Sequence, residues 1–203
     1  MDCGTDGEIE KVGVRSQGEP CLPVRVSLHM EIELSICALR PCRDGDQADI
    51  VRHANNPNVA THLRDVFPQP YTRNDADKWI AHVAKESPPL NLAITVENRL
   101  IGGIGLMPGT DIHRVSAEVG YWLGESHWGR GIATCALQGI TQYAFATFSE
   151  LNRLFAYVDQ DHAASIRVLE KAGFRCEGRL IGAAVKHGQI RNQILYAITR
   201  AET

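Results

Sequence analysis

The sequence predicts a mixed α/β domain in which helices pack on one β-sheet with a single central crossover. Segments with apolar residues at every second position alternate along the chain with segments of helical spacing. Two of the strand segments are joined by the two-residue turn Glu97-Asn98, which is typical of a β-hairpin. The composition, 44% hydrophobic and 22% charged over 203 residues, is that of an ordinary globular chain.

The first 29 residues differ from the remainder of the chain. They contain several glycines and prolines and follow neither the strand period nor the helical period. We therefore expect a leader over residues 1–29, either natural or added in cloning, with Met30 as the natural first residue. A single domain is expected over residues 30–203.

The domain is predicted to begin with one strand and one helix. The strand covers residues 31–40, where apolar residues alternate with polar ones, and Pro41 ends it. Asp44 is expected to cap a helix that runs to about Asn55, where Asn56-Pro57 stops it. The apolar stripe predicted for this helix is Ala48, Ile50, Val51 and Ala54.

A proline-rich loop and a second helix follow. The loop covers residues 57–71, and the pair Thr72 and Asp75 resembles a capping box that opens the helix. The helix runs to about Lys85 and stops before Ser87-Pro88-Pro89. The residues expected to be buried on it are Ala76, Trp79, Ile80 and Val83.

The second half of the chain alternates strands and helices. Strands are expected at 91–96, 99–107, 115–123, 153–159, 174–183 and 189–199. Helices are expected from about 132 to 148 and from 162 to 172. Gly173 ends the latter because glycine accepts the left-handed cap conformation. Gly102, Gly103 and Gly105 indicate a bulge or a close backbone approach within their strand.

Charge and residue spacing exclude several classes of protein. The net charge is −3 and the pI about 6.2, whereas nucleic-acid-binding surfaces are basic. No apolar run approaches the ~18–20 residues of a membrane span, and the first thirty residues lack a secretory apolar core. The six cysteines and eight histidines show no metal-binding spacing. We predict a cytoplasmic protein with reduced thiols, without a metal, a nucleic-acid partner or a membrane partner.

The most informative segment spans residues 116–134, where a strand runs into a glycine-bearing loop that opens a helix. The first N–H groups of a helix lack intrahelical partners and lie at the positive end of its dipole. Gly129 and Gly131 remove side-chain obstruction, and Arg130 adds a positive charge, so a diphosphate could bind there. The alternative is a plain strand-to-helix turn. No Gly-Lys-Ser/Thr follows, which excludes a P-loop, and the third Rossmann glycine is absent.

Several motifs occur in a characteristic order over about residues 32–200. They are Leu63-Arg64-Asp65 with Pro70-Tyr71, A-E-V-G-Y-W-L at 117–123, W-G-R-G-I-A-T at 128–134, S-I-R-V-L-E-K-A-G-F at 165–174 and G-Q-I-R-N at 188–192. In this order and spacing the chain resembles the GNAT superfamily of acyl-CoA-dependent N-acyltransferases. The resemblance is to the branch that contains ribosomal-protein N-terminal acetyltransferases and spermidine acetyltransferase-like enzymes. It implies a twisted α/β sheet of about seven strands, with helices on both faces and a splay between strands four and five.

The resemblance further implies acetyl-CoA as the co-substrate, bound in the splay. Backbone groups of Tyr121, Trp122 and Leu123 would pair with the pantetheine amides. His162 and Ser165 would flank the pantetheine and the sulfur. The pyrophosphate would be held by backbone amides of Trp128, Gly129, Arg130, Gly131, Ile132, Ala133 and Thr134.

Three positions depart from the family pattern. Trp128 stands where a glutamine or arginine is usual, although the backbone donors remain. His162 replaces the usual asparagine, and its protonation would make binding there pH-dependent. Some members carry a tyrosine general acid where this chain has Leu169, so a tyrosine-acid mechanism is doubtful at that position.

Glu118 is the candidate general base, because it lies on the strand that would meet the acyl-CoA and matches an acidic residue used by some relatives. Strand alternation places Glu118 and Trp122 on one face and Tyr121 on the other. The alternative is that Glu118 only orders the sheet. A backbone N–H near residues 120–122 is the expected oxyanion donor. Ser165 would assist the leaving thiolate, or would merely cap its helix.

The acceptor side is less defined by the sequence. Arg64 and Tyr71 are candidate substrate residues by family position, while a surface ion pair and packing are their alternatives. Trp122 is the third candidate, either in the acceptor wall or in the core. A polyamine site would gather carboxylates, but Asp65, Asp75 and Asp77 are interleaved with arginines. The acceptor is therefore a small-molecule amine or a peptide N-terminus.

Two alternative functions and the oligomeric state remain open. One is an acyl-CoA-binding sensor without turnover, and another is a different acyl group accommodated around Gly102–Gly105. A homodimer could cover the edge left by the last two strands. Cys135 is expected to be a small buried residue, not a nucleophile, and Trp79 has no predicted role in the site.

Overall fold

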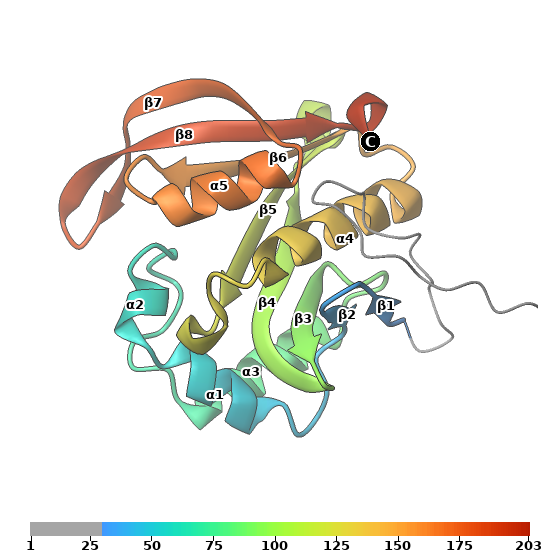
Figure 1. Cartoon of the computed structure of the whole chain (residues 1–203), viewed down its shortest axis with the longest axis vertical. Coiled ribbons are helices and arrows are strands. Elements are labelled where there is room, and N and C mark those ends of the chain that lie inside the picture. The colour runs from blue at the N-terminus through green and yellow to red at the C-terminus, as the bar shows by residue number, and fades with distance from the viewer. Residues whose placement is uncertain (1–29) are drawn as a thin grey trace, which may run out of the picture.

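One eight-stranded sheet organises the domain (Figure 1). The computed structural model describes residues 30–203, so the predicted leader over 1–29 lies outside the described residues. The strand order is β1-β2-β3-β4-β5-β6-β8-β7. The strands are β1 (Ile32–Glu33), β2 (Ala38–Arg40), β3 (Asn91–Val96), β4 (Arg99–Pro108), β5 (Ser116–Leu123), β6 (Arg153–Asp159), β7 (Arg175–Lys186) and β8 (Gln189–Thr199). The helices are α1 (Gln47–Ala54), α2 (Pro57–Ala60), α3 (Arg73–Val83), α4 (Ile132–Thr147) and α5 (Ala163–Lys171).

The prediction of one strand over 31–40 is wrong. The segment forms two short antiparallel strands, β1 and β2, with a turn closed by the Leu34 N–H donating to the Cys37 carbonyl at 3.0 Å. Ile32 and Leu39 are fully buried, whereas Ile36, in the turn, is 47% exposed. The apolar alternation continues through this turn, so the sequence pattern does not show where β1 ends and β2 begins.

The predicted cap of α1 is also wrong. Asp46, not Asp44, precedes the helix, and its side chain makes no capping bond. Its carboxylate instead binds the buried Arg40 guanidinium through two hydrogen bonds of 2.8 and 2.9 Å. This pair lowers the pKa of Asp46 and raises that of Arg40. Of the predicted stripe, Ile50 and Ala54 are buried and Ala48 is exposed.

The second predicted helix is confirmed as α3, with its capping box between Thr72 and Asp75. The predicted loop before it contains one additional helical turn, α2, which Asn56 caps by accepting from the Asn58 N–H at 2.9 Å. Trp79 was expected in the core but is 38% exposed. It lies on the helix face beside the cavity described below.

The hairpin and the later elements agree with the sequence pattern. Glu97 and Asn98 take positive φ angles of 49° and 61°, which a two-residue hairpin turn requires. A register shift in the β3–β4 pairing marks the bulge predicted near the β4 glycines. Gly173 has φ +95°, as expected for the glycine that ends α5.

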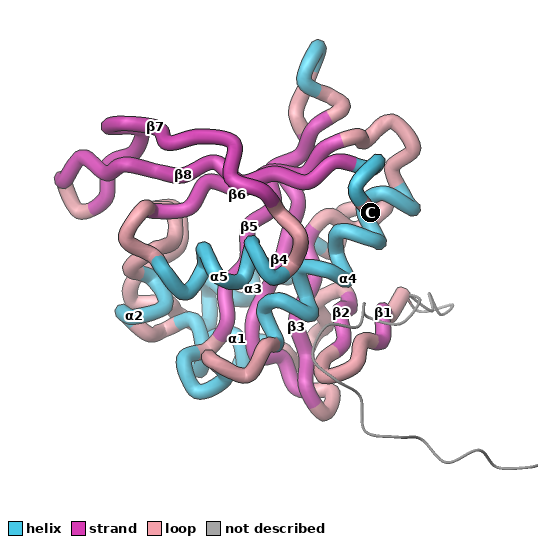
Figure 2. The backbone as a smooth tube through the Cα atoms, turned by 45° about the horizontal axis from the view of Figure 1, so that its top comes forward, coloured by secondary structure: helices cyan, strands magenta, loops and turns pink. Residues whose placement is uncertain are grey.

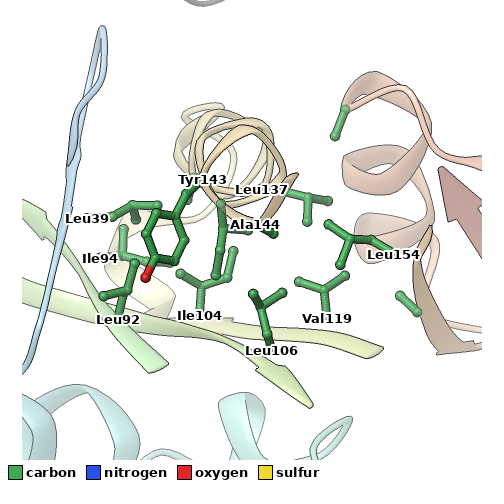
Figure 3. Packing of buried hydrophobic residues seen from close by; sticks show 14 of the residues in the cluster. Leu39, Leu92, Ile94, Ile104, Leu106, Val119, Leu137, Tyr143, Ala144 and Leu154 are labelled. Atoms are coloured by element: carbon green, nitrogen blue, oxygen red, sulfur yellow. The ribbon is translucent and has the colours of Figure 1, made fainter. Parts of the chain in front are cut away.

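Two apolar clusters lie on opposite faces of the sheet. The larger one joins the sheet to α4 and α5, and Figure 3 shows Leu137 and Ala144 of α4 above Ile104, Leu106 and Val119. The smaller one joins β3 and β4 to α1 and α3, and Trp122 packs against it. Val119 and Trp122 thus lie on opposite faces of β5, as the alternation predicts.

The sheet parts between β5 and β6. These strands are parallel, yet they pair only at Ser116↔Arg153, Ala117↔Leu154 and Glu118↔Phe155. From residue 119 onward β5 remains paired with β4, while β6 continues along β8. Figure 2 shows β6, β7 and β8 turned away from the β3–β5 half of the sheet. Counting 31–40 as one strand, this is the splay expected between strands four and five.

Candidate active site

A cavity of about 670 Å³ occupies the gap between β5 and β6. Its walls come mainly from β4, β5, β6, the start of α4, the length of α5 and the loop after α2. The cavity reaches both faces of the sheet, because Val119 and Leu169 line it together with Trp122 and Phe67. On its β6 side, β5 leaves the main-chain groups of residues 119–123 without a strand partner.

The start of α4 forms one end of this cavity. Gly131, the residue before the helix, has φ +79° and offers no side-chain cap to the first N–H groups. Gly129 has φ +74°, and a Cβ built there meets nothing within 4 Å. All of Trp128–Thr134 lines the cavity. These unblocked donors at the positive end of a 16-residue helix fit the diphosphate of a coenzyme.

Trp128 has a structural role that the sequence does not reveal. Its indole N–H donates to the Leu123 carbonyl at 2.7 Å, so the ring ties the loop to the end of β5. On the opposite side, Glu125 accepts hydrogen bonds from Asn56 at 2.7 Å and Asn58 at 2.9 Å. The loop that presents the α4 donors is therefore fixed from two directions.

Tyr121 and Ser165 meet across the gap. The Tyr121 hydroxyl lies 2.8 Å from Ser165 Oγ, which joins β5 to the first turn of α5. Burial raises the pKa of Tyr121 to about 12, so its hydroxyl stays protonated at neutral pH. Only the backbone of Tyr121 was predicted to belong to the site, so this hydroxyl is an addition from the structure.

His162 lies beside the cavity and is stacked on His62. The ring centroids are 3.8 Å apart, and the rings are inclined by 14°. Burial and the neighbouring His62 lower the pKa of His162 to about 4. His162 is therefore neutral at physiological pH, and the pH dependence expected there falls in the acid range. His62 was not among the predicted site residues, although it also lines the cavity.

We expect His162 to make the protein less stable in acid. Its folded-state pKa of about 4 lies below the ordinary value of 6.5, so the unfolded chain binds the proton first as the pH falls. The free energy of unfolding contributed by this group therefore decreases between about pH 6.5 and about pH 4. His162→Asn should show a smaller fall in Tm from neutral pH to about pH 5, measured by circular dichroism. His187→Asn, in the exposed β7–β8 turn, is the control; equal falls in both variants contradict the prediction.

Glu118 points into the cavity and is paired. Its two carboxylate oxygens accept from Arg64 Nη2 at 2.7 and 2.6 Å, and its side chain is 18% exposed. The Arg64 side chain is 59% exposed, so it can swing away into solvent. The structure thus brings together Glu118 and Arg64, two predicted site residues that are 54 positions apart.

The other predicted acceptor residues form an aromatic wall. Tyr71 is buried, and its ring centroid lies 5.1 Å from that of Phe67, which in turn lies 5.8 Å from Trp122. Phe67 and Trp79 also line the cavity, although neither was predicted to belong to the site. The available signal for Phe67 was its place in the proline-rich loop, four residues before Tyr71.

The β4 glycines serve close packing. A Cβ at Gly103 would lie 2.7 Å from Trp122 Nε1, and one at Gly105 would lie 2.1 Å from Asn91 Oδ1. The space above these glycines is therefore already filled by side chains. The β4–β5 register is regular, so no bulge turns an N–H of residues 120–122 outward.

A cavity between parting strands, closed at one end by an uncapped helix start, is the arrangement expected of an acyl-CoA-dependent transferase. The profile of the acetyltransferase (GNAT) domain matches residues 37–175. The N-acetyltransferase p20 of Bacillus licheniformis is 34% identical over 161 residues, which cover 77% of this chain and 89% of that protein. The spermidine N(1)-acetyltransferase of Escherichia coli strain K12 is 28% identical over 162 residues, covering 79% and 84% of the two chains. Mycobacterium smegmatis RimJ in complex with CoA-disulfide has a TM-score of 0.72 at 26% identity, with 90% of this chain and 88% of that one covered.

The chain belongs to the acetyltransferase (GNAT) domain family. This confirms the resemblance, the fold class and the assignment as an acetyl-CoA-dependent enzyme. Within residues 30–203, no cluster of three His, Cys, Asp or Glu side chains is placed to hold a metal ion. No helix in the same part of the chain has the length and hydropathy to cross a membrane.

Proposed function

We propose that this enzyme transfers the acetyl group of acetyl-CoA to a primary amine by direct attack in a ternary complex. One observation carries the proposal: Glu118, Ser165 and the uncapped start of α4 all face the same cavity. Relatives named as spermidine N(1)-acetyltransferase and ribosomal-protein-serine acetyltransferase support an amine acceptor.

The coenzyme would be held mainly by backbone groups. The N–H groups of Trp128–Thr134 would bind the pyrophosphate, and the unpaired edge of Tyr121–Leu123 would pair with the pantetheine. The Leu123 carbonyl already accepts from Trp128, so the N–H and C=O groups nearer Tyr121 are the better partners. His162, neutral and fixed by its stack on His62, would pack against the pantetheine.

Glu118 would serve as the general base. A free alkylammonium has a pKa near ~10, so the amine must lose a proton before it attacks the thioester carbon. Arg64 would leave Glu118 as the amine arrives, and the carboxylate would accept the proton directly or through water. A C–N bond forms, the C–S bond breaks, CoA leaves as the thiolate, and the second proton of the nitrogen passes to that thiolate or to water. A main-chain N–H of Gly120–Trp122 would donate to the carbonyl oxygen as its charge develops.

Ser165 would donate a hydrogen bond to the leaving thiolate. Its partner Tyr121 holds the serine hydroxyl at 2.8 Å and orients it from the opposite wall. Leu169 lines the cavity on the same helix and has no proton to donate. The Tyr121–Ser165 pair supplies the hydroxyl chemistry that Leu169 cannot.

Replacing Tyr121 by phenylalanine tests this pair. We expect kcat to fall about fivefold, since one neutral hydrogen bond contributes about 1 kcal/mol. The KM for acetyl-CoA should stay within about twofold, because the backbone contacts are unchanged. Steady-state kinetics with Tyr143→Phe as the control separate this effect from general loss of packing, because the Tyr143 hydroxyl binds the Pro89 carbonyl outside the cavity. Equal kcat in wild type and Tyr121→Phe removes the tyrosine from the mechanism.

The proposed function is tested by thiol release from acetyl-CoA in the presence of amines and of peptides with free N-termini. We expect amine-dependent release and an acetylated product seen by mass spectrometry. If CoA binds in calorimetry but no acceptor supports release, the chain is a non-catalytic acyl-CoA-binding module, and catalysis is excluded.

We also propose a cytoplasmic location, one domain over 30–203 and a homodimer. Cys42 and Cys176 are thiols without a disulfide, as is usual in a reducing compartment.

The homodimer would form at β7, which is one of the two edge strands of the sheet. Ile181 and Val185 on β7 are 72% and 63% exposed, so a second copy could cover this edge.

A further inference from the structure

The cavity carries an unusual charge distribution for an enzyme that acts on amines. Among the described residues that line it, Glu118 is the only carboxylate. The permanent cations along the same lining are Arg64, Arg130, Arg167 and Lys171. Because Glu118 serves the reacting amine in the proposed mechanism, the lining offers no other carboxylate to a second ammonium group.

The carboxylates of the acceptor loop and of α3 are paired or do not line the cavity, and Asp159, whose Oδ2 lies 3.8 Å from His62 Nδ1, does not line the cavity either. Asp65 binds Lys186 Nζ at 2.9 Å, and that ammonium also donates to the Leu63 carbonyl at 2.7 Å. Asp75 accepts from both the N–H and the hydroxyl of Thr72 at the start of α3. Asp77 does not line the cavity. No acidic cluster in residues 30–203 therefore faces the acceptor.

The acceptor end is instead walled by apolar side chains. Phe67, Tyr71 and Trp122 form consecutive ring contacts with centroids 5.1 and 5.8 Å apart. At the rim, Val66 is 83% exposed and Met107 is 41% exposed, and both line the cavity. Covering such a surface with an apolar ligand is favourable, because it removes apolar area from water.

We propose that the acceptor is a monoamine carried on an apolar or aromatic body, and not a polyamine. The inference rests on the proposed function and adds the substrate class. An apolar wall also favours the neutral form of an amine, since desolvation disfavours its charged form. The attacking nitrogen is then easier to deprotonate, whereas a second ammonium must be desolvated without a carboxylate partner.

A matched pair of amines tests the inference. Hexylamine and 1,6-diaminohexane share one carbon chain and differ by the second amino group. We expect kcat/KM for hexylamine to exceed that for the diamine by about tenfold or more, with 2-phenylethylamine above spermidine in the same order. An equal or reversed preference overturns the inference. It is also overturned if spermidine or a peptide N-terminus is acetylated while hexylamine and 2-phenylethylamine are not.

Binding gives a readout that does not depend on turnover. All three tryptophans of the chain, Trp79, Trp122 and Trp128, line the cavity, so intrinsic fluorescence reports its occupation. In the presence of CoA, hexylamine is expected to change the fluorescence at lower concentration than 1,6-diaminohexane. If no amine is acetylated, the proposed function fails. Even then, the comparison of the hexylamine and 1,6-diaminohexane titrations supports or overturns the assignment of an apolar monoamine as the ligand.

A charge introduced at the rim should change this preference. Val66→Asp places a carboxylate on an exposed lining residue, where it need not disturb the core. The hexylamine-to-diaminohexane ratio of kcat/KM should fall at least about threefold. Ile112→Asp, at a 73% exposed position outside the cavity, is the matched control and should keep the wild-type ratio. An unchanged ratio in Val66→Asp places the acceptor away from this wall and overturns the inference.

Discussion

Glu118→Gln is expected to lower kcat about 100-fold while the dissociation constant of CoA stays within about twofold. The glutamine keeps the size of the side chain and its position on β5, but it cannot accept the proton of the attacking amine. The proposed coenzyme contacts lie on the backbone of β5 and at the start of α4, so CoA binding should not be affected. Steady-state kinetics give kcat, and calorimetry gives the CoA dissociation constant.

A second ion-paired glutamate provides the control for this variant. Glu177 on β7 binds Arg153 through two hydrogen bonds, just as Glu118 on β5 is bound by Arg64, but it does not line the cavity. Glu177→Gln should keep the wild-type kcat. If Glu118→Gln loses no more activity than Glu177→Gln and both lower Tm alike, Glu118 only orders the sheet. The general base must then be sought elsewhere.

The regular parts of the fold could be predicted because their signals are local. The hairpin turn at Glu97-Asn98, the Thr72–Asp75 capping box and the glycine that ends α5 each depend on a few adjacent residues. The β1–β2 turn could not, because Ile36 continues the apolar alternation although it is exposed. The sequence also could not show that Asp46, and not Asp44, precedes α1. Asp46 is held by Arg40, and this contact depends on how the strand that carries Arg40 is placed in the folded chain.

Candidate site residues could be proposed from the sequence, but the contacts between distant side chains could not. Gly129, Gly131 and the start of α4 follow from one continuous segment. The Arg64–Glu118 pair, the Tyr121–Ser165 contact and the His62–His162 stack join residues far apart in the chain. Each of these contacts either crosses the gap between β5 and β6 or joins the loop after α2 to the walls of that gap. Only the folded structure therefore reveals them.

Gly129→Val should weaken CoA binding about 30-fold, which corresponds to about 2 kcal/mol. Gly129 has φ +74°, a left-handed conformation that a β-branched residue adopts only at a cost. Its missing side chain also leaves open the space in front of the α4 donors, where a Cβ meets nothing within 4 Å. Valine would both strain this loop and cover the N–H groups that are expected to bind the diphosphate through charge-assisted hydrogen bonds.

Gly188 allows the strain and the blocked site to be separated. It lies in the β7–β8 turn with φ +73°, and a Cβ there also meets nothing within 4 Å, but it does not line the cavity. Gly188→Val therefore carries the same backbone cost and should lower Tm about as much as Gly129→Val. Calorimetry should show wild-type CoA affinity for Gly188→Val and the full loss for Gly129→Val. Equal affinities in the two variants would mean that the diphosphate does not bind at the start of α4, and the assignment of the gap between β5 and β6 as the coenzyme site would have to be withdrawn.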